Sequence, residues 1–144
     1  MATFRAEIRS PLPPDEAFAR MAAFERVPEW DPATTASTRL GPEAGLGAEY
    51  DVTTRFAGRT MLVRYRTTAY APPTRLVLEA TLPNGNALRD EITVAPEGTG
   101  SCVTYDARIA ATGLWRLADP IFQLVFTRVG ARAMPEIRRF LDAS

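Results

Sequence analysis

The chain has 144 residues, 46% of them hydrophobic and 24% charged, and no formal net charge, so we expect residues 1–144 to form a single domain without an overall field that attracts nucleic acid or an anionic membrane. All 17 basic residues are arginine, because the sequence contains neither lysine nor histidine. These two absences exclude a histidine nucleophile, general base or metal site, a lysine Schiff base and a phosphate-binding P-loop.

The N-terminal part predicts one strand followed by short helical segments. Residues 3–9 alternate apolar and polar side chains, which is the period of a half-buried strand, and a proline-rich stretch ends it. Apolar residues then recur at helical spacing and predict a short helix at about 14–24, with two acids in its first turn. The segment Pro28-Glu29-Trp30-Asp31-Pro32 is too rich in proline for a long helix and predicts a tight loop or a single turn.

Six further runs of alternating apolar residues predict a meander. They lie near 34–40, 47–56, 59–70, 75–81, 87–95 and 101–111, and clusters of glycine, proline and asparagine separate them. Short turns between consecutive strands favour antiparallel pairing, so with the first strand we expect a sheet of about seven strands.

The last thirty residues return to helical period. One line of the expected helix carries Leu117, Ile121, Val125, Val129 and Ala133, and Phe122, Phe126, Ile137 and Leu141 flank it. Asp119 before Pro120 predicts a helix start at 120 after a short turn at 114–118. Pro135 removes a backbone donor, which predicts a kink near 131–135 and, with Gly130, a weak point where a gate to the interior could lie.

This order of elements predicts a curved antiparallel sheet whose apolar face is buried against the long C-terminal helix, with two short helices after the first strand. A cavity remains wherever the side chains between them do not fill the space. The chain has no stretch of eighteen uncharged apolar residues and no apolar run at its start, so we expect a cytoplasmic protein without stable membrane insertion. The lone Cys102 cannot form an internal disulfide.

Several short motifs together with this order resemble a known superfamily. They are Pro28-Glu29-Trp30-Asp31-Pro32, Gly45-x-Gly47-x-x-Tyr50, Asp90-x-Ile92-x-Val94 before Gly98-Thr99-Gly100, Val103-x-Tyr105 and Leu117-Ala118-Asp119-Pro120. The chain looks like a member of the START-like (SRPBCC, Bet v 1-like) superfamily, and more narrowly of its bacterial polyketide cyclase/dehydrase-like branch. The resemblance covers almost the whole chain and implies an α+β helix-grip fold. It implies activity less specifically, because the superfamily holds lipid and quinone carriers, aromatase/cyclases, hydratases and stress proteins.

The sequence departs from parts of this superfamily. Bet v 1-like enzymes that use a catalytic lysine and oxygenase relatives that bind iron through histidines are excluded as models. In the aromatic polyketide aromatase/cyclases, the strand corresponding to 59–70 carries inward tryptophans and an inward arginine. Here the same parity turns Tyr65 inward and turns Arg64 and Arg66 outward, where we expect them to pair with acids across the strands.

Asp90 is the one acid on the predicted inward face of the sheet. It could act as a general acid or base on a substrate carbonyl or its alpha proton, with a pKa raised by desolvation. It could instead pair with an arginine or cap a loop at the start of its strand. Tyr65 could donate a hydrogen bond to a ligand oxygen beside it, or it could be a core aromatic bonded to backbone or water.

The expected ligand-binding residues share the inward parity of the strands or lie on the buried face of the last helix. They are Trp30, Tyr50, Val52, Thr54, Phe56, Met61, Val63, Thr67, Leu78, Leu88, Ile92, Tyr105, Phe122, Val125, Phe126 and Val129. Trp30 is either a flap over the mouth of the cavity or a plug between the first helix and the sheet.

The sequence therefore predicts a protein that binds a hydrophobic or aromatic small molecule, such as a lipid, a quinone or a polyketide-like compound, in an internal cavity. The alternative is a cofactor-free cyclase, dehydratase or isomerase that uses Asp90 and Tyr65. A second alternative is an interaction module whose cavity is filled by its own side chains. Whether the protein is an enzyme and how many copies assemble stay open, and no cofactor or metal is expected.

Overall fold

The computed structural model of the protein describes residues 2–42, 44–56, 58–82, 85–110, 117 and 119–142. Inside these ranges the side chains of Phe56, Asp119, Phe122, Val125, Phe126, Val129 and Asp142 lie outside the description. The turn predicted at 114–118 falls outside the described residues except at Leu117.

Seven antiparallel strands form one sheet in the described chain, in the order β1-β7-β6-β5-β4-β3-β2. They are β1 (Ala2–Ser10), β2 (Thr34–Leu40), β3 (Glu49–Phe56), β4 (Arg59–Ala71), β5 (Arg75–Thr81), β6 (Ala87–Glu97) and β7 (Gly100–Ala110). The strands from β2 to β7 pair in chain order, and β1 closes the series by pairing with β7. The predicted meander and the α+β helix-grip fold are confirmed.

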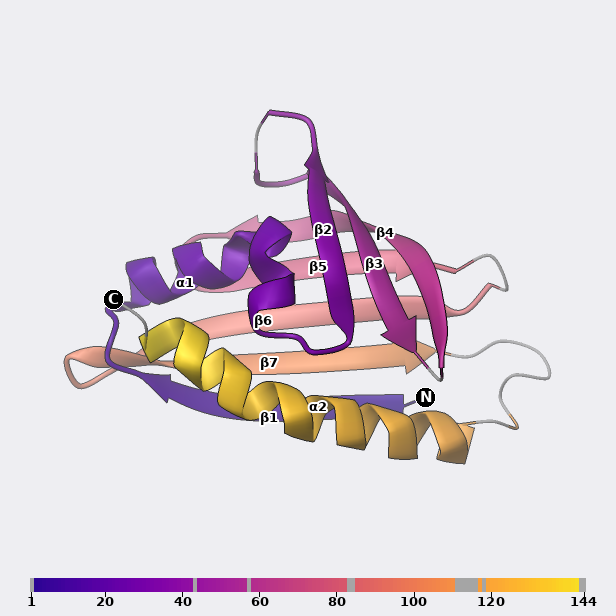
Figure 1. The fold of residues 1–144 in the computed structure, drawn as a ribbon. Coiled ribbons are helices and arrows are strands. Elements are labelled where there is room, and N and C mark those ends of the chain that lie inside the picture. The colour runs from indigo at the N-terminus through magenta and orange to yellow at the C-terminus, as the bar shows by residue number, and fades with distance from the viewer. Residues whose placement is uncertain are drawn as a thin grey trace.

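Two short helices follow β1, as the sequence predicts. The first is α1 (Pro14–Ala22), with proline at its start and Asp15 and Glu16 in its first turn, where acids complement the helix dipole. The second is the 3-10 helix η1 (Phe24–Glu29), which takes the place of the expected loop or single turn. The sheet curves so that β2 and β3 come in front of β5 and β6, and η1 lies on that inner side (Figure 1).

The long helix α2 (Asp119–Asp142) lies along the edge strand β1 (Figure 1). The Gln123 Nε2 group donates to the Thr3 carbonyl at 2.8 Å, and the Thr3 N–H donates to Gln123 Oε1 at 2.9 Å. This side chain therefore occupies backbone groups on the open side of an edge strand, which would otherwise be free to pair with another chain.

Gly130 and Pro135 are the two residues of α2 from which the sequence predicts a kink or a weak point in the helix. A Cβ at Gly130 would overlap the Phe4 ring, so glycine allows β1 and α2 to approach closely. The helix continues through Pro135 without interruption, so the proline does not end it. Figure 1 shows the C-terminal part of α2 inclined to its first part.

The buried face of α2 is shorter than the sequence predicts. Ala133 and Ile137 are buried, but Leu117 and Ile121 are 81% and 64% exposed, so their predicted burial is wrong. The helix packs mainly against the edge strand β1 rather than across the middle of the sheet.

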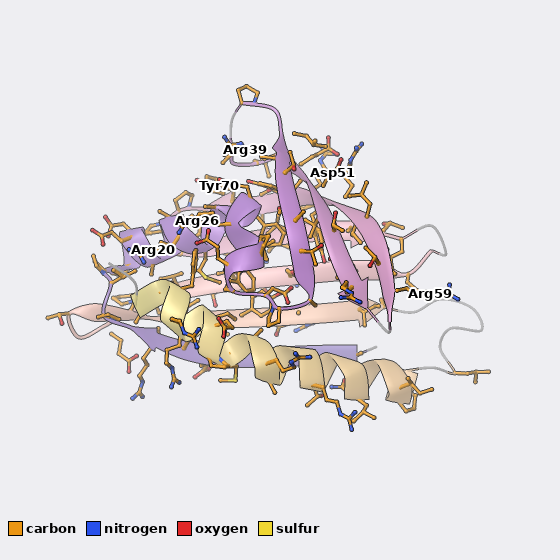
Figure 2. All side chains as sticks on the ribbon, viewed as in Figure 1. Arg20, Arg26, Arg39, Asp51, Arg59 and Tyr70 are labelled. Carbon is orange, nitrogen blue, oxygen red and sulfur yellow. The ribbon has the colours of Figure 1, made fainter. Side chains whose placement is uncertain are left out.

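The outer face of the sheet carries ion pairs between neighbouring strands. The Arg64 Nε group lies 2.8 Å from Asp51 Oδ1, and the Arg75 Nε group lies 2.6 Å from Glu91 Oε2. The predicted outward direction and pairing of Arg64 are confirmed, and Figure 2 shows Asp51 at the periphery of the molecule. Pairs this exposed contribute little to stability, because water screens their attraction. No helix in the described part of the chain is long and apolar enough to cross a membrane.

Candidate functional site

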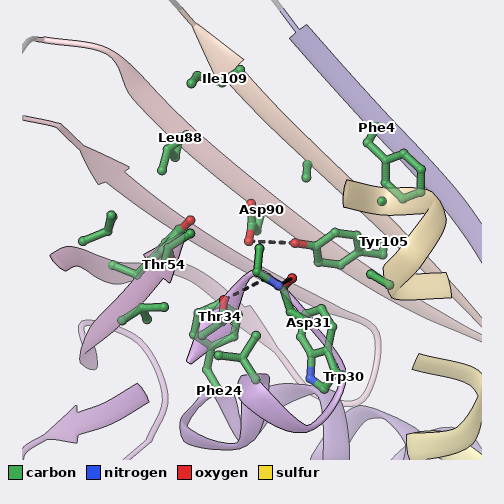
Figure 3. A pocket seen from close by; sticks show the side chains of 18 of the residues that line it. Phe4, Phe24, Trp30, Asp31, Thr34, Thr54, Leu88, Asp90, Tyr105 and Ile109 are labelled. Atoms are coloured by element: carbon green, nitrogen blue, oxygen red, sulfur yellow. Dashed lines mark hydrogen bonds between the residues drawn. The ribbon is translucent and has the colours of Figure 1, made fainter. Parts of the chain in front are cut away.

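A cavity of about 100 Å³ lies between the inner face of the sheet, η1 with the loop that follows it, and α2 (Figure 3). The described residues that line it are Phe4, Phe24, Val27, Trp30, Asp31, Ala33, Thr34, Val52, Thr54, Met61, Val63, Tyr65, Leu82, Leu88, Asp90, Tyr105, Ala107, Ile109, Gly130 and Ala133. Most of this lining is apolar, so its few polar groups determine the chemistry of the site.

Asp90 lies inside β6 on the inner face and is 7% exposed. The Tyr105 hydroxyl on β7 donates to Asp90 Oδ2 at 2.9 Å. The alternative in which Asp90 pairs with an arginine or caps a loop is therefore wrong for the described residues. Burial raises the pKa of Asp90 to about 7, although the Tyr105 hydrogen bond lowers it. Near neutral pH the carboxyl is therefore present in both protonation states, which suits a group that gives and takes protons.

Asp31 is a second carboxyl in the cavity wall, and sequence reasoning did not single it out. Its Oδ1 accepts the Ala33 N–H at 2.9 Å, and its Oδ2 accepts the Thr34 hydroxyl at 2.9 Å. Burial raises the pKa of Asp31, although both hydrogen bonds lower it. The sequence Asp-Pro-Ala-Thr is typical of an Asx turn, but nothing in it predicts that the turn faces the cavity.

Aromatic rings form a continuous cluster beside the two acids. The Phe24 ring meets the Tyr65 ring at 5.5 Å and the Trp30 ring at 6.5 Å between centroids, and Trp30 meets Tyr105 at 5.4 Å. Trp30 is 1% exposed, which fits a plug between η1 and the sheet and not a surface flap. Its Nε1 is buried without a hydrogen-bond partner among the described residues.

Both cavity tyrosines remain protonated over the ordinary pH range. Burial, with the nearby charges of Asp90 and Asp31, raises the pKa of Tyr65 and of Tyr105 well above the usual value of 10.0. Each hydroxyl is therefore a neutral group that can donate a hydrogen bond. Among the described residues, no three Cys, Asp or Glu side chains gather in a way that could hold a metal ion.

Most of the predicted site residues whose side chains are described lie together in the cavity wall. Besides Asp90 and Tyr65, the wall contains the predicted Trp30, Val52, Thr54, Met61, Val63, Leu88 and Tyr105. The side chains of Phe56, Phe122, Val125, Phe126 and Val129 lie outside the described residues.

Four predicted residues have the right parity but are not among the residues that line the cavity. Tyr50, Thr67, Leu78 and Ile92 are buried in the core instead. The short helices fill that part of the cup: the Phe24 ring lies 5.6 Å from the Tyr50 ring, and Phe18 of α1 is buried in the same core. Strand parity predicts which face a side chain takes, but not which part of that face other elements cover.

Two kinds of lining residue are not among the expected ligand-binding residues. Phe4, Ala107 and Ile109 share the inward parity of their strands, so the alternation of apolar residues contained the signal. Phe24 and Val27 lie on η1, and no local pattern indicates that this helix turns toward the cavity. The site is thus built by the sheet, by the segment that connects β1 to β2 and by α2.

Solved structures with the same fold include proteins from three bacteria. TTHA0849 from Thermus thermophilus is 14% identical, with 96% of each chain covered and a TM-score of 0.76. A START superfamily protein from Mycobacterium smegmatis is 9% identical, with 98% of this chain and 97% of that chain covered and a TM-score of 0.77. The Zhui aromatase/cyclase from Streptomyces sp. R1128 is 14% identical, with 95% of this chain and 91% of that chain covered and a TM-score of 0.73. At such identities the likeness shows the fold alone.

A sequence comparison with curated proteins finds no match. The sequence profile of the family described as "Polyketide cyclase / dehydrase and lipid transport" matches residues 1–143. This match spans almost the whole chain and agrees with the helix-grip fold. The chain therefore belongs to the polyketide cyclase / dehydrase and lipid transport family.

Proposed function

We propose that the protein binds a compact hydrophobic small molecule in the cavity between the sheet, η1 and α2. The observation that carries this proposal is an internal space with mostly apolar walls and a few polar groups at fixed positions. Burial of apolar ligand surface supplies affinity in such a site, and the polar groups fix orientation. Membership of the family supports hydrophobic ligand binding or polyketide cyclase chemistry.

The volume of the cavity limits the size of the ligand. A closed apolar cavity of roughly 150 Å³ holds a benzene ring, whereas this cavity measures about 100 Å³. A compact branched group therefore fits as the walls stand, and a single six-membered ring already requires them to move slightly apart. A long acyl chain or a fused polycyclic compound requires the walls to move apart.

A pair of alanine substitutions tests the proposal. Ala107 is buried in the cavity wall, whereas Ala95 is exposed on the other face of the sheet. Ala107→Leu should fill much of the space and weaken benzene binding, measured by calorimetry, by about tenfold or more. Ala95→Leu makes the same chemical change outside the cavity and should leave binding unchanged. Equal affinity of both variants and the wild type would overturn the proposal.

One observation favours a second function, proton transfer on a bound carbonyl compound. Asp90 has a pKa of about 7 and holds the Tyr105 hydroxyl inside the cavity. The ionised carboxylate can take an alpha proton from a ketone, which leaves an enolate, and the resulting carboxylic acid can return the proton to the same carbon. The enzyme alternative from the sequence uses Asp90 and Tyr65. The tyrosine that is hydrogen-bonded to Asp90 is Tyr105, and Tyr65 lines the same cavity.

Alpha-proton exchange tests this function without knowledge of the natural substrate. Cyclopentanone in D₂O should exchange its alpha protons faster with the wild-type protein than with Asp90→Asn, as followed by proton NMR. Asp51→Asn changes the same functional group on the outer face and should exchange like the wild type. If Asp90→Asn and the wild type exchange equally fast, Asp90 has no part in proton transfer.

A further inference from the structure

The described cavity wall contains acids and aromatic rings but no basic side chain. Its carboxyl groups belong to Asp31 and Asp90, and its rings are Phe4, Phe24, Trp30, Tyr65 and Tyr105. A ligand that carries a carboxylate or a phosphate would therefore find no counter-charge in this wall. It would also meet two carboxyl groups, which repel an anion when they are ionised.

Asp90 keeps one oxygen available to a ligand. Tyr105 donates to Oδ2, whereas Oδ1 has no hydrogen bond to a described residue. Both oxygens of Asp31 are already occupied by Ala33 and Thr34. A buried carboxylate without a cationic partner is costly, and the raised pKa of Asp90 reflects that cost. A ligand cation would supply the missing charge.

The aromatic cluster suits the same kind of ligand. The rings of Tyr65, Phe24, Trp30 and Tyr105 follow one another with centroids 5.4 to 6.5 Å apart, and the last of them bonds Asp90. Aromatic faces attract ammonium groups through the ring quadrupole, and tryptophan does so most strongly. Figure 3 shows Trp30, Phe24 and Tyr105 gathered around Asp90 and Asp31.

We propose that the cavity binds the ammonium group of a small organic cation, which forms an ion pair with the free oxygen of Asp90 and contacts the surrounding aromatic rings. This inference rests on the proposed function and adds the charge of the ligand to it. The cavity discriminates against anionic ligands of similar shape, so fatty acids and other carboxylates are excluded as ligands.

The charge state of the site sets the pH at which the cation binds best. The titratable groups that face or influence Asp90 are Asp31 in the loop after η1, Tyr65 on β4, and Tyr105 and Asp106 on β7, and all of them are neutral or negative. Binding needs the ionised form of Asp90, so affinity for a permanent cation should increase as pH rises through about 7.

Three compact probes of similar shape test the proposal by calorimetry at a pH well above the pKa of Asp90. Tetramethylammonium is cationic, tert-butyl alcohol is neutral and trimethylacetate is anionic. We expect the cation to bind about tenfold more tightly than the alcohol and the anion not to bind. Because the comparison uses the wild-type protein, it does not depend on a variant that folds.

Two variants assign the preference to the cavity. Asp90→Asn should bring the affinity for tetramethylammonium down to that of the alcohol, whereas Asp51→Asn removes a charge from the outer face and should not. An equal loss of affinity for tetramethylammonium in both variants would show that the net charge of the protein attracts the cation, and would overturn the assignment of the cation to the cavity. If benzene and the alcohol bind but the cation binds no better, the inference fails and the proposed function stands. If neither benzene nor any of the three probes binds, both fail.

Discussion

The buried carboxyl of Asp90 should make the protein less stable as pH rises. The Asp90→Asn variant should lack this part of the pH dependence. Burial raises the pKa of Asp90 from 3.8 to about 7 in the folded chain. The folded state therefore holds this proton more tightly than the unfolded state does, and stability is lost as pH rises between these two values. Asparagine has a similar shape and no proton to lose.

The size of the effect follows from the two pKa values. Their difference corresponds to about 4 kcal/mol of stability in total, and about 2.5 kcal/mol of it falls between about pH 5 and pH 8. The free energy of unfolding of Asp90→Asn relative to the wild type should thus rise by about this amount over that range. Glu29, Asp51 and Glu91 have lowered pKa values, so their contributions lie at lower pH and cancel in the comparison.

Urea unfolding at about pH 5 and pH 8, followed by circular dichroism, measures this difference. Asp51→Asn is the control, because it removes a carboxylate that an arginine holds on the outer face. Its stability relative to the wild type should not change across the range. If the difference between Asp90→Asn and the wild type were also independent of pH, the assignment of a raised pKa to Asp90 would be refuted.

Two further substitutions address the packing of α2 and the hydrogen bond in the cavity. Gly130→Ala should lower the free energy of unfolding by about 1–3 kcal/mol, because the new methyl group overlaps the Phe4 ring. Adding Phe4→Leu to this variant should recover part of the loss. A Gly130→Ala variant as stable as the wild type in urea unfolding would contradict the close contact. Tyr105→Phe removes a bond that lowers the pKa of Asp90, so carbon-detected NMR should find the carboxyl titrating above about 7, and an unchanged or lower midpoint would argue against that bond.

The strands and their inner faces could be predicted because their alternation is a local property. Most apolar side chains of the strands point to the core, so the alternation predicts the inner face for Val52, Val63 and Leu88, and all three line the cavity. The register then brings Ile92 opposite Tyr105 and Asp90 opposite Ala107. This pairing places the Tyr105 hydroxyl near Asp90, a contact that sequence spacing alone does not give.

The remaining features depend on how elements pack against one another. Asp31 is part of the turn that directly follows η1, and the sequence does not indicate that this turn faces the cavity. Leu117 and Ile121 continue an apolar line, but both side chains are exposed. Tyr50 has inward parity, yet the Phe24 ring separates it from the cavity. Each of these outcomes requires tertiary contacts that no periodicity contains.

The central claim is that a small apolar molecule enters the cavity between the sheet, η1 and α2. Methyl-group NMR during a titration with benzene tests it most directly. The account predicts saturable shifts at the methyl groups of Val63, Leu88 and Ile109, which line the cavity, and none at Leu62, which is 63% exposed on the outer face. Absence of saturable shifts at the three inner residues, or equal shifts at Leu62, would contradict it.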